Sequence, residues 1–205
     1  MPTNLDGLLA ELRVELHETF AAVDVWFDRP ASLRAFIPED QGWTIEEVLN
    51  HIGLTSHYLL ILIEKGTAKA LANSQGRNLA EEMAHYHFPR ETLAAIGTLR
   101  AFPWQRPEHM EPRTYPRPLS AVRQQMSEQL GQLLSCLDRL THGEGLLYQT
   151  TMSVNGLGKL NVYEYVYFLA QHARRHLTQM QENEAEWLAQ LPAEVALALQ
   201  TTRHA

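Results

Sequence analysis

NVYEYVYFLAQHARRHLTQM, residues 161–180, is the stretch on which the fold and the function of this chain depend most. It opens with a capping box: the Asn161 side chain can accept from the Glu164 amide while the Glu164 carboxylate accepts from the Asn161 amide. Apolar residues then recur every three or four positions. This spacing predicts one long amphipathic helix that ends before Pro192.

Two histidines on this predicted helix lie one turn apart. Each helical residue advances by about 100°, so His172 and His176 differ by about 40° and share one face. The projection places His176 within the apolar arc and His172 at its edge, so both are expected to point inward. A buried imidazole needs a polar partner. Cβ atoms about 5–6 Å apart would let both rings bind one metal ion.

A second capping box, Thr44 with Glu47, predicts another helix that runs to Gly66. His51 lies beside the apolar face of this helix, whereas His57 projects to the solvent side. Three imidazoles from two facing helices would leave a fourth metal position for water or substrate, as in catalytic zinc sites. The alternative is a metal-free bundle in which these histidines only form hydrogen bonds.

Two further amphipathic segments, residues 5–28 and 119–140, complete a predicted all-α four-helix bundle with extra short helices and long loops. A shorter helix is expected to open after Pro89 and run to Leu99. The whole chain, residues 1–205, is expected to form a single domain.

Three segments between or after the long helices carry their own patterns. The proline-rich insertion at residues 101–118 is incompatible with regular helix and is expected on the surface, wrapped over the bundle or forming a rim. Residues 150–154 are predicted to be extended, and residues 193–200 to add a short last helix.

Composition excludes several classes of function. A formal charge of −7 argues against a nucleic-acid-binding surface. The single cysteine, Cys136, excludes an internal disulfide and a thiolate zinc cluster, and its helical context predicts a buried thiol. The chain has no secretion signal at its start and no apolar run of about 20 residues, so a cytoplasmic protein without a membrane span is expected.

The remaining histidines have weaker patterns. His85 and His87 alternate as in a metal-binding strand, but without a suitable third ligand a loop or pocket rim is favoured. Surface positions are expected for the histidines without a partner in sequence, namely His17, His109, His142 and His204.

Two motifs resemble a known family. The run GWTIEEVLNH, residues 42–51, resembles the tryptophan, Ser/Thr, glutamate and histidine signature of the DinB/YfiT-like family, which carries its first metal ligand. The run QHARRHLTQ, residues 171–179, resembles the second signature, a pair of histidines followed by glutamine. The resemblance extends from Leu5 to Gln190, although the insertion at residues 101–118 has no counterpart in it.

This resemblance implies an up-down-down-up four-helix bundle in which His51, His172 and His176 bind nickel, zinc or iron. It also implies a small-molecule enzyme: a metal-dependent hydrolase, or an S-transferase that uses a low-molecular-weight thiol such as bacillithiol or mycothiol. A non-catalytic metal-binding or stress-response bundle is the alternative, and a homodimer is plausible. No carboxylate has an obvious spacing for a general base, which slightly favours thiol transfer over hydrolysis.

Residues beside the predicted metal ligands are the further site candidates. Gln179 lies on the ligand side of its helix and is predicted to contact a metal ligand, and Tyr165 projects towards the same face. Arg174 and Arg175 are expected to be solvated, with either able to bind an anionic substrate near the site.

Overall fold

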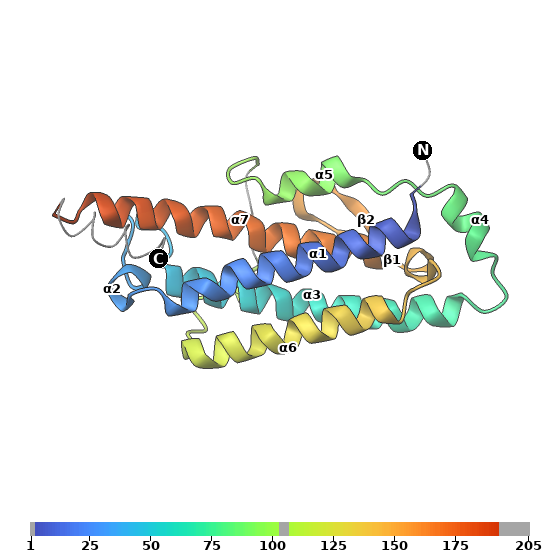
Figure 1. Ribbon diagram of the computed structural model, residues 1–205, viewed down its shortest axis with the longest axis horizontal. Helices are drawn as coiled ribbons and strands as arrows, with labels where there is room; N and C mark the ends of the chain where they lie inside the picture. Colours follow the sequence, from blue (N-terminus) through green and yellow to red (C-terminus); the bar gives the residue numbers. More distant parts are fainter. Residues whose placement is uncertain (1–2, 103–106, 193–205) are drawn as a thin grey trace.

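The computed structural model describes residues 3–102 and 107–192. Its four long helices are α1 (Leu5–Asp24), α3 (Ile45–Asn73), α6 (Leu119–Asp138) and α7 (Val162–Ala189). In Figure 1, α1 and α7 run in one direction and α3 and α6 run in the opposite direction. Helix α3 packs against α6 and α7, and α1 packs against the same two helices. The predicted all-α bundle is confirmed.

Shorter elements connect the long helices. The short α-helices are α2 (Ala31–Arg34), α4 (Leu79–Ala84) and α5 (Arg90–Ala94). The 3₁₀ turns are η1 (Val25–Asp28), η2 (Ala95–Gly97), η3 (Glu108–Met110), η4 (Glu144–Leu147) and η5 (Val154–Gly156). The helix predicted after Pro89 thus exists, although it ends at Gly97 rather than near Leu99. The predicted helix at residues 193–200 lies outside the described residues.

A hairpin precedes the last helix. Strand β1 (Gln149–Met152) pairs antiparallel with β2 (Gly158–Asn161), with Gln149 opposite Asn161. The extended segment predicted at residues 150–154 corresponds to β1. Strand β2 leads straight into the cap of α7, which fixes where that helix begins.

Both predicted capping boxes form. The Glu47 amide donates to Thr44 Oγ1 at 3.2 Å, and Glu47 Oε2 accepts from the Thr44 amide at 2.9 Å. At α7, the Glu164 amide donates to Asn161 Oδ1 at 3.1 Å and Glu164 Oε2 accepts from the Asn161 amide at 2.8 Å. Two donors at each helix start are therefore satisfied, and each box sets the rotational phase of a histidine-bearing helix.

Helix α3 continues through Gly66, where the sequence predicted its end, to Asn73. A Cβ atom at Gly66 would lie 3.1 Å from Val162 Cγ2 and 3.3 Å from Tyr148 Cδ1. The missing side chain thus permits close packing of α3 against the start of α7. This packing outweighs the roughly 1 kcal/mol by which glycine disfavours a helix interior.

The first half of α7 lies at the centre of the molecule. Every residue from Val162 to Ala173 is buried, because α1, α3, α5, η2 and β2 all pack against this helix. Cys136 is also buried, as predicted. His172 consequently lies where α7 is still surrounded by protein.

The described part of the proline-rich stretch crosses over α3. We call residues 107–115 the roof segment. Asn50 Nδ2 donates to the carbonyl oxygens of Tyr115 at 2.8 Å and Pro112 at 3.3 Å. Arg113 Nε donates to Glu47 Oε1 at 2.8 Å, and its Nη2 donates to the Gly42 carbonyl oxygen at 2.7 Å. The predicted rim is therefore present and is anchored to the beginning of α3.

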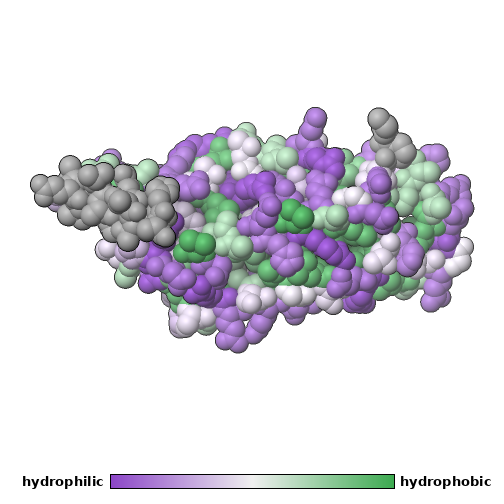
Figure 2. All heavy atoms as spheres, in the orientation of Figure 1, coloured by the Kyte–Doolittle hydropathy of each residue, from purple (hydrophilic) through white to green (hydrophobic). Residues whose placement is uncertain are grey.

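The surface is mixed in polarity. Figure 2 shows hydrophobic areas interrupted by hydrophilic side chains on the face that it presents. None of the described helices combines the length and the apolar character that crossing a bilayer requires. The homodimer stays a prediction.

Candidate metal centre

Three buried histidine rings converge between α3 and α7. His51 comes from α3 and His172 and His176 come from α7, and each is 4–5% exposed. One ring nitrogen from each histidine lies within 4.8 Å of the others. The ring centroids are 4.6 Å apart for His172 and His176, 4.8 Å for His51 and His176, and 5.2 Å for His51 and His172. The structure thus brings together the three side chains that the sequence singled out.

Hydrogen bonds at Nδ1 fix the orientation of two of these rings. His51 Nδ1 lies 2.8 Å from the carbonyl oxygen of Met110 in the roof segment. A carbonyl oxygen only accepts, so Nδ1 carries the proton and Nε2 keeps its lone pair. His176 Nδ1 lies 2.8 Å from Gln179 Oε1, which assigns the same tautomer. Metal-bound histidines typically have such a partner at the second nitrogen.

The nitrogen spacing of His172 and His176 fits the binding of both to a single divalent ion. Two nitrogens at about 2.0–2.1 Å from one ion are roughly 2.8–3.4 Å apart for angles between about 90° and 109°. His172 Nε2 and His176 Nε2 are 3.2 Å apart. Without an ion, the two Nε2 atoms share one proton in a hydrogen bond. With an ion, the lone pairs of both atoms can ligate the metal. The all-imidazole donor set suits zinc, nickel or iron.

Burial keeps the imidazoles of His172 and His176 neutral. Burial lowers the pKa of His172 well below its usual range, and positive charge on His176, His51 and Arg175 opposes its protonation further. Burial likewise lowers the pKa of His176, with a charged His51 adding to the effect, while the Gln179 hydrogen bond acts in the opposite direction. Neutral imidazole is the form that binds a metal ion.

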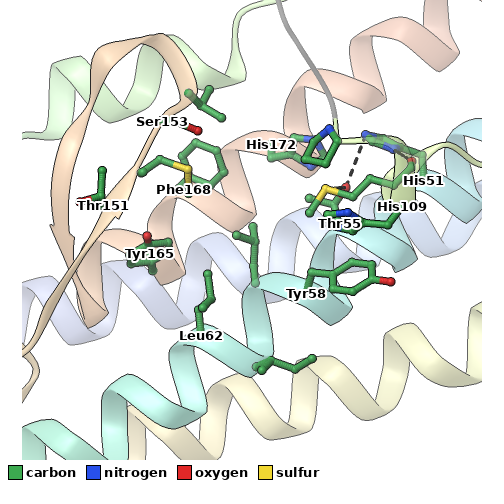
Figure 3. Close-up of a pocket in the computed structure, with 16 residues that line it drawn as sticks. His51, Thr55, Tyr58, Leu62, His109, Thr151, Ser153, Tyr165, Phe168 and His172 are labelled. Atoms are coloured by element: carbon green, nitrogen blue, oxygen red, sulfur yellow. Dashed lines mark hydrogen bonds between the residues drawn. The ribbon is translucent and has the colours of Figure 1, made fainter.

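Two hollows of different polarity reach the histidines. The first, which we call the apolar cleft, has a volume of about 450 Å³ and is lined by side chains that include Leu59, Leu62, Met110, Met152, Tyr165 and Phe168. The second, the polar pocket, has a volume of about 310 Å³ and is lined by side chains that include Gln41, Trp43, Arg113, Arg175 and Gln179. His51 and His172 line both hollows. Figure 3 shows them at one end of the apolar cleft.

The further candidate residues separate into these two hollows. Tyr165 lines the apolar cleft, where its phenol oxygen accepts from Thr150 Oγ1 at 2.8 Å. Gln179 and Arg175 line the polar pocket. Burial and the nearby charge of Arg100 lower the pKa of Arg175. Arg174 is not at the site, because it forms an ion pair with Glu15 of α1 at 2.8 Å.

Sequence patterns missed the contribution of the roof segment and of Trp43. The Trp43 ring centroid lies 4.6 Å from that of His51, and its Nε1 donates to Glu111 at 3.2 Å. Met110 contributes a backbone carbonyl, which has no signature in a sequence. Trp43 did have a signal, since it belongs to the motif that contains His51, but that motif does not say what the ring contacts.

The other histidines lie elsewhere. His17, His57 and His142 are exposed, as the sequence patterns indicated, and His85 and His87 lie in the loop that was favoured for them. His109 is also exposed, yet it lines the apolar cleft with its ring 4.3 Å from that of Tyr58. His204 lies outside the described residues. Within residues 3–102 and 107–192, His51, His172 and His176 are the one set of three potential metal ligands at this spacing.

Comparison with known proteins gives one finding. The family model described as the DinB superfamily matches residues 8–180 of the chain. This range includes His51, His172, His176 and Gln179. Neither the curated proteins nor the solved structures include a significant match.

Proposed function

The chain belongs to the DinB superfamily, and on this premise we propose that it is a divalent-metal-dependent S-transferase that uses a low-molecular-weight thiol. His51, His172 and His176 would hold the ion. When bound, such an ion supplies Lewis acidity, which lowers the pKa of a thiol or a water molecule that ligates it. The other residues of the site would bind and orient the substrates.

The observation that carries the proposal is the lining of the two hollows. Neither Asp nor Glu is among the described side chains that line the apolar cleft or the polar pocket. A hydrolase of this kind benefits from a general base beside the attacking water. A thiol needs less help, since ligation to a metal deprotonates it. The absence of a carboxylate from these described linings therefore supports thiol transfer over hydrolysis, and the one imidazole of the linings outside the three-histidine cluster is His109 of the apolar cleft.

In the proposed reaction the thiol sulfur forms a bond to an electrophilic carbon of the second substrate. The bond from that carbon to its leaving group breaks, and the leaving group departs with the bonding electrons. The thiol proton is released to solvent or to the leaving group. Since the two hollows meet at His51 and His172, each can hold one substrate while both reach the same centre.

The polar pocket would receive the thiol, with Arg175 binding a carboxylate on it. A guanidinium binds carboxylates through paired hydrogen bonds. Arg175 lines this pocket beside His172 and His176, whereas the adjacent Arg174 is held by Glu15. We expect Arg175→Met to raise the KM for a carboxylate-bearing thiol about tenfold, which corresponds to about 1.4 kcal/mol, while Arg174→Met leaves it unchanged.

The test is a conjugation assay on untagged protein reconstituted separately with zinc, nickel and iron. Bacillithiol, mycothiol and mercaptosuccinate are offered with an alkyl-halide electrophile, and the thioether is measured by mass spectrometry. We expect product formation that requires metal, is lost in His172→Ala and persists in His57→Ala. Metal-dependent hydrolysis of an ester or amide panel without thioether formation would assign a hydrolase instead. Metal binding with neither activity would assign a non-catalytic bundle.

A further inference from the structure

We propose that the apolar cleft binds the second substrate of this reaction, and that this substrate is an elongated, uncharged molecule with an apolar body. That the bound molecule is a substrate rests on the proposed function. Its chemical class follows from the cleft itself. Three features of the cleft carry it: its length, its lack of carboxylate, Lys and Arg side chains, and the polar groups at its far end.

The cleft is long and follows two helices away from the histidines. On α3, the lining residues His51, Thr55 and Leu62 lie on one face and span 11 positions, which is about 16 Å. On α7, Phe168 and Tyr165 continue the lining for two turns from His172, which is about 10 Å. Figure 3 shows His51 and His172 at one end and Tyr165 at the other. An elongated molecule fits this shape with its reactive end at the histidines.

The described walls contain neither carboxylates nor the side chains of Lys or Arg, and most of the described lining residues contribute aliphatic, thioether or aromatic surface. Moving an unpaired charge into such surroundings is strongly unfavourable. Met110 and Met152 have flexible side chains that adapt to ligands of different outline. A volume of about 450 Å³ is within the range of small-molecule sites.

Polar groups stand at the end of the cleft far from the histidines. Tyr165, Thr151 and Ser153 line this end. The Tyr165 oxygen accepts from Thr150 at 2.8 Å and can still donate its own proton. A hydrogen-bond acceptor on an otherwise apolar ligand would orient it, so that the opposite end points to the histidines. The polar pocket, which is lined by Arg175 and by the Glu47-paired Arg113, is the complementary place for an anion.

The test uses N-phenyl-1-naphthylamine, a neutral apolar fluorophore, and measures its dissociation constant by fluorescence. Displacement by 1-octanol and by octanoate then compares an uncharged with a charged ligand of equal chain length. We expect the fluorophore to bind and octanol to displace it at concentrations at least about tenfold lower than octanoate does, since the carboxylate must be desolvated. No binding, or displacement by octanoate at equal or lower concentration, would overturn the inference.

Matched variants locate the binding. Leu62 lines the cleft and is 41% exposed, and Val14 of α1 is 51% exposed and lines neither hollow. We expect Leu62→Glu to weaken fluorophore binding about tenfold or more and Val14→Glu to leave it unchanged. Ile61→Glu, at the neighbouring lining position, replaces Leu62→Glu if that variant loses its helical circular dichroism. Equal binding by wild type and by the folded cleft variant would contradict the assignment.

Failure of this inference and failure of the proposed function can be told apart. Fluorophore binding requires neither metal nor thiol. Octanol selectivity without thioether formation would reject only the transferase, and thioether formation with displacement favouring octanoate would reject only the ligand class.

Discussion

Helices α7 and α3 position their histidines by different means. On α7, the spacing of His172 and His176 and the acceptor of Gln179 all come from one helix of known periodicity. On α3, the ring of His51 is oriented by the Met110 carbonyl, 59 positions away in sequence. The α7 part of the centre is thus determined locally, whereas the α3 part depends on how the roof segment is held. The difference predicts how each part responds to substitution.

The largest effect is expected from removing a ligand on either helix. His172→Ala and His51→Ala should each lower the affinity for Co²⁺, used as a spectroscopic probe, by more than about 100-fold. Loss of a residue that only hydrogen-bonds to a metal ligand lowers affinity roughly 10–100-fold, and loss of the ligand itself should cost more. Visible absorption and competition with a chelator measure this. The exposed His57→Ala variant should bind as wild type does. Equal affinity of His57→Ala and His172→Ala would remove the basis for the assignment.

A smaller effect is expected from the local partner on α7. Gln179→Ala removes the acceptor at 2.8 Å from His176 Nδ1 and should lower metal affinity about tenfold. Gln179→Glu retains an acceptor and should restore most of it. Gln124→Ala, which removes an exposed glutamine on α6 that pairs with Glu128, is the control and should have no effect. Affinity that is unchanged in Gln179→Ala would show that this hydrogen bond does not orient His176.

The smallest change in metal affinity is expected from a substitution on α3 that loosens the roof segment. This substitution should also lower the stability of the fold. Asn50→Ala releases the carbonyls of Pro112 and Tyr115 and should destabilise the fold by about 1–3 kcal/mol. Because the loosened roof segment still carries Met110, metal affinity should fall by less than about tenfold. Urea unfolding and Co²⁺ binding measure the two quantities. Asn73→Ala is the matched control, since Asn73 also donates to a carbonyl, that of Leu147, but at an exposed position.

If Asn50→Ala lowered stability without any change in metal affinity, the roof segment would be a structural strap only. If it lowered affinity as much as His51→Ala does, the roof would hold His51 more tightly than one carbonyl contact implies. Either result would revise the comparison between the two helices.

The features that the sequence predicts are those set locally within one helix, and the features that it does not predict depend on contacts between distant segments. The capping boxes at Thr44 and Asn161 and the apolar spacing set the start and the rotation of α3 and α7, so the inward placement of the three histidines was predictable from local rules. Gln179 was predictable for the same reason. The end of α3 was not, because Gly66 is tolerated only through its packing against Val162 and Tyr148.

The polar pocket, the apolar cleft and the roof segment depend on contacts between distant parts of the chain. Adjacent arginines illustrate this, since Arg174 turns to Glu15 of α1 while Arg175 lines the polar pocket, and nothing in the sequence distinguishes them. His109 was expected on the surface and is exposed there, yet tertiary structure also places it at the cleft. Local periodicity predicts ligands on helices; it does not predict the loops that complete a site.

The most direct measurement is the metal content of wild-type protein purified without a histidine tag and dialysed after loading with Zn²⁺. Three buried imidazoles that each offer a nitrogen within 4.8 Å of the others predict one tightly held ion per chain by elemental analysis. That ion should be absent from His172→Ala and retained in His57→Ala. Protein that folds as a helical bundle but holds no stoichiometric metal would contradict the account and leave the histidines as a hydrogen-bonded cluster.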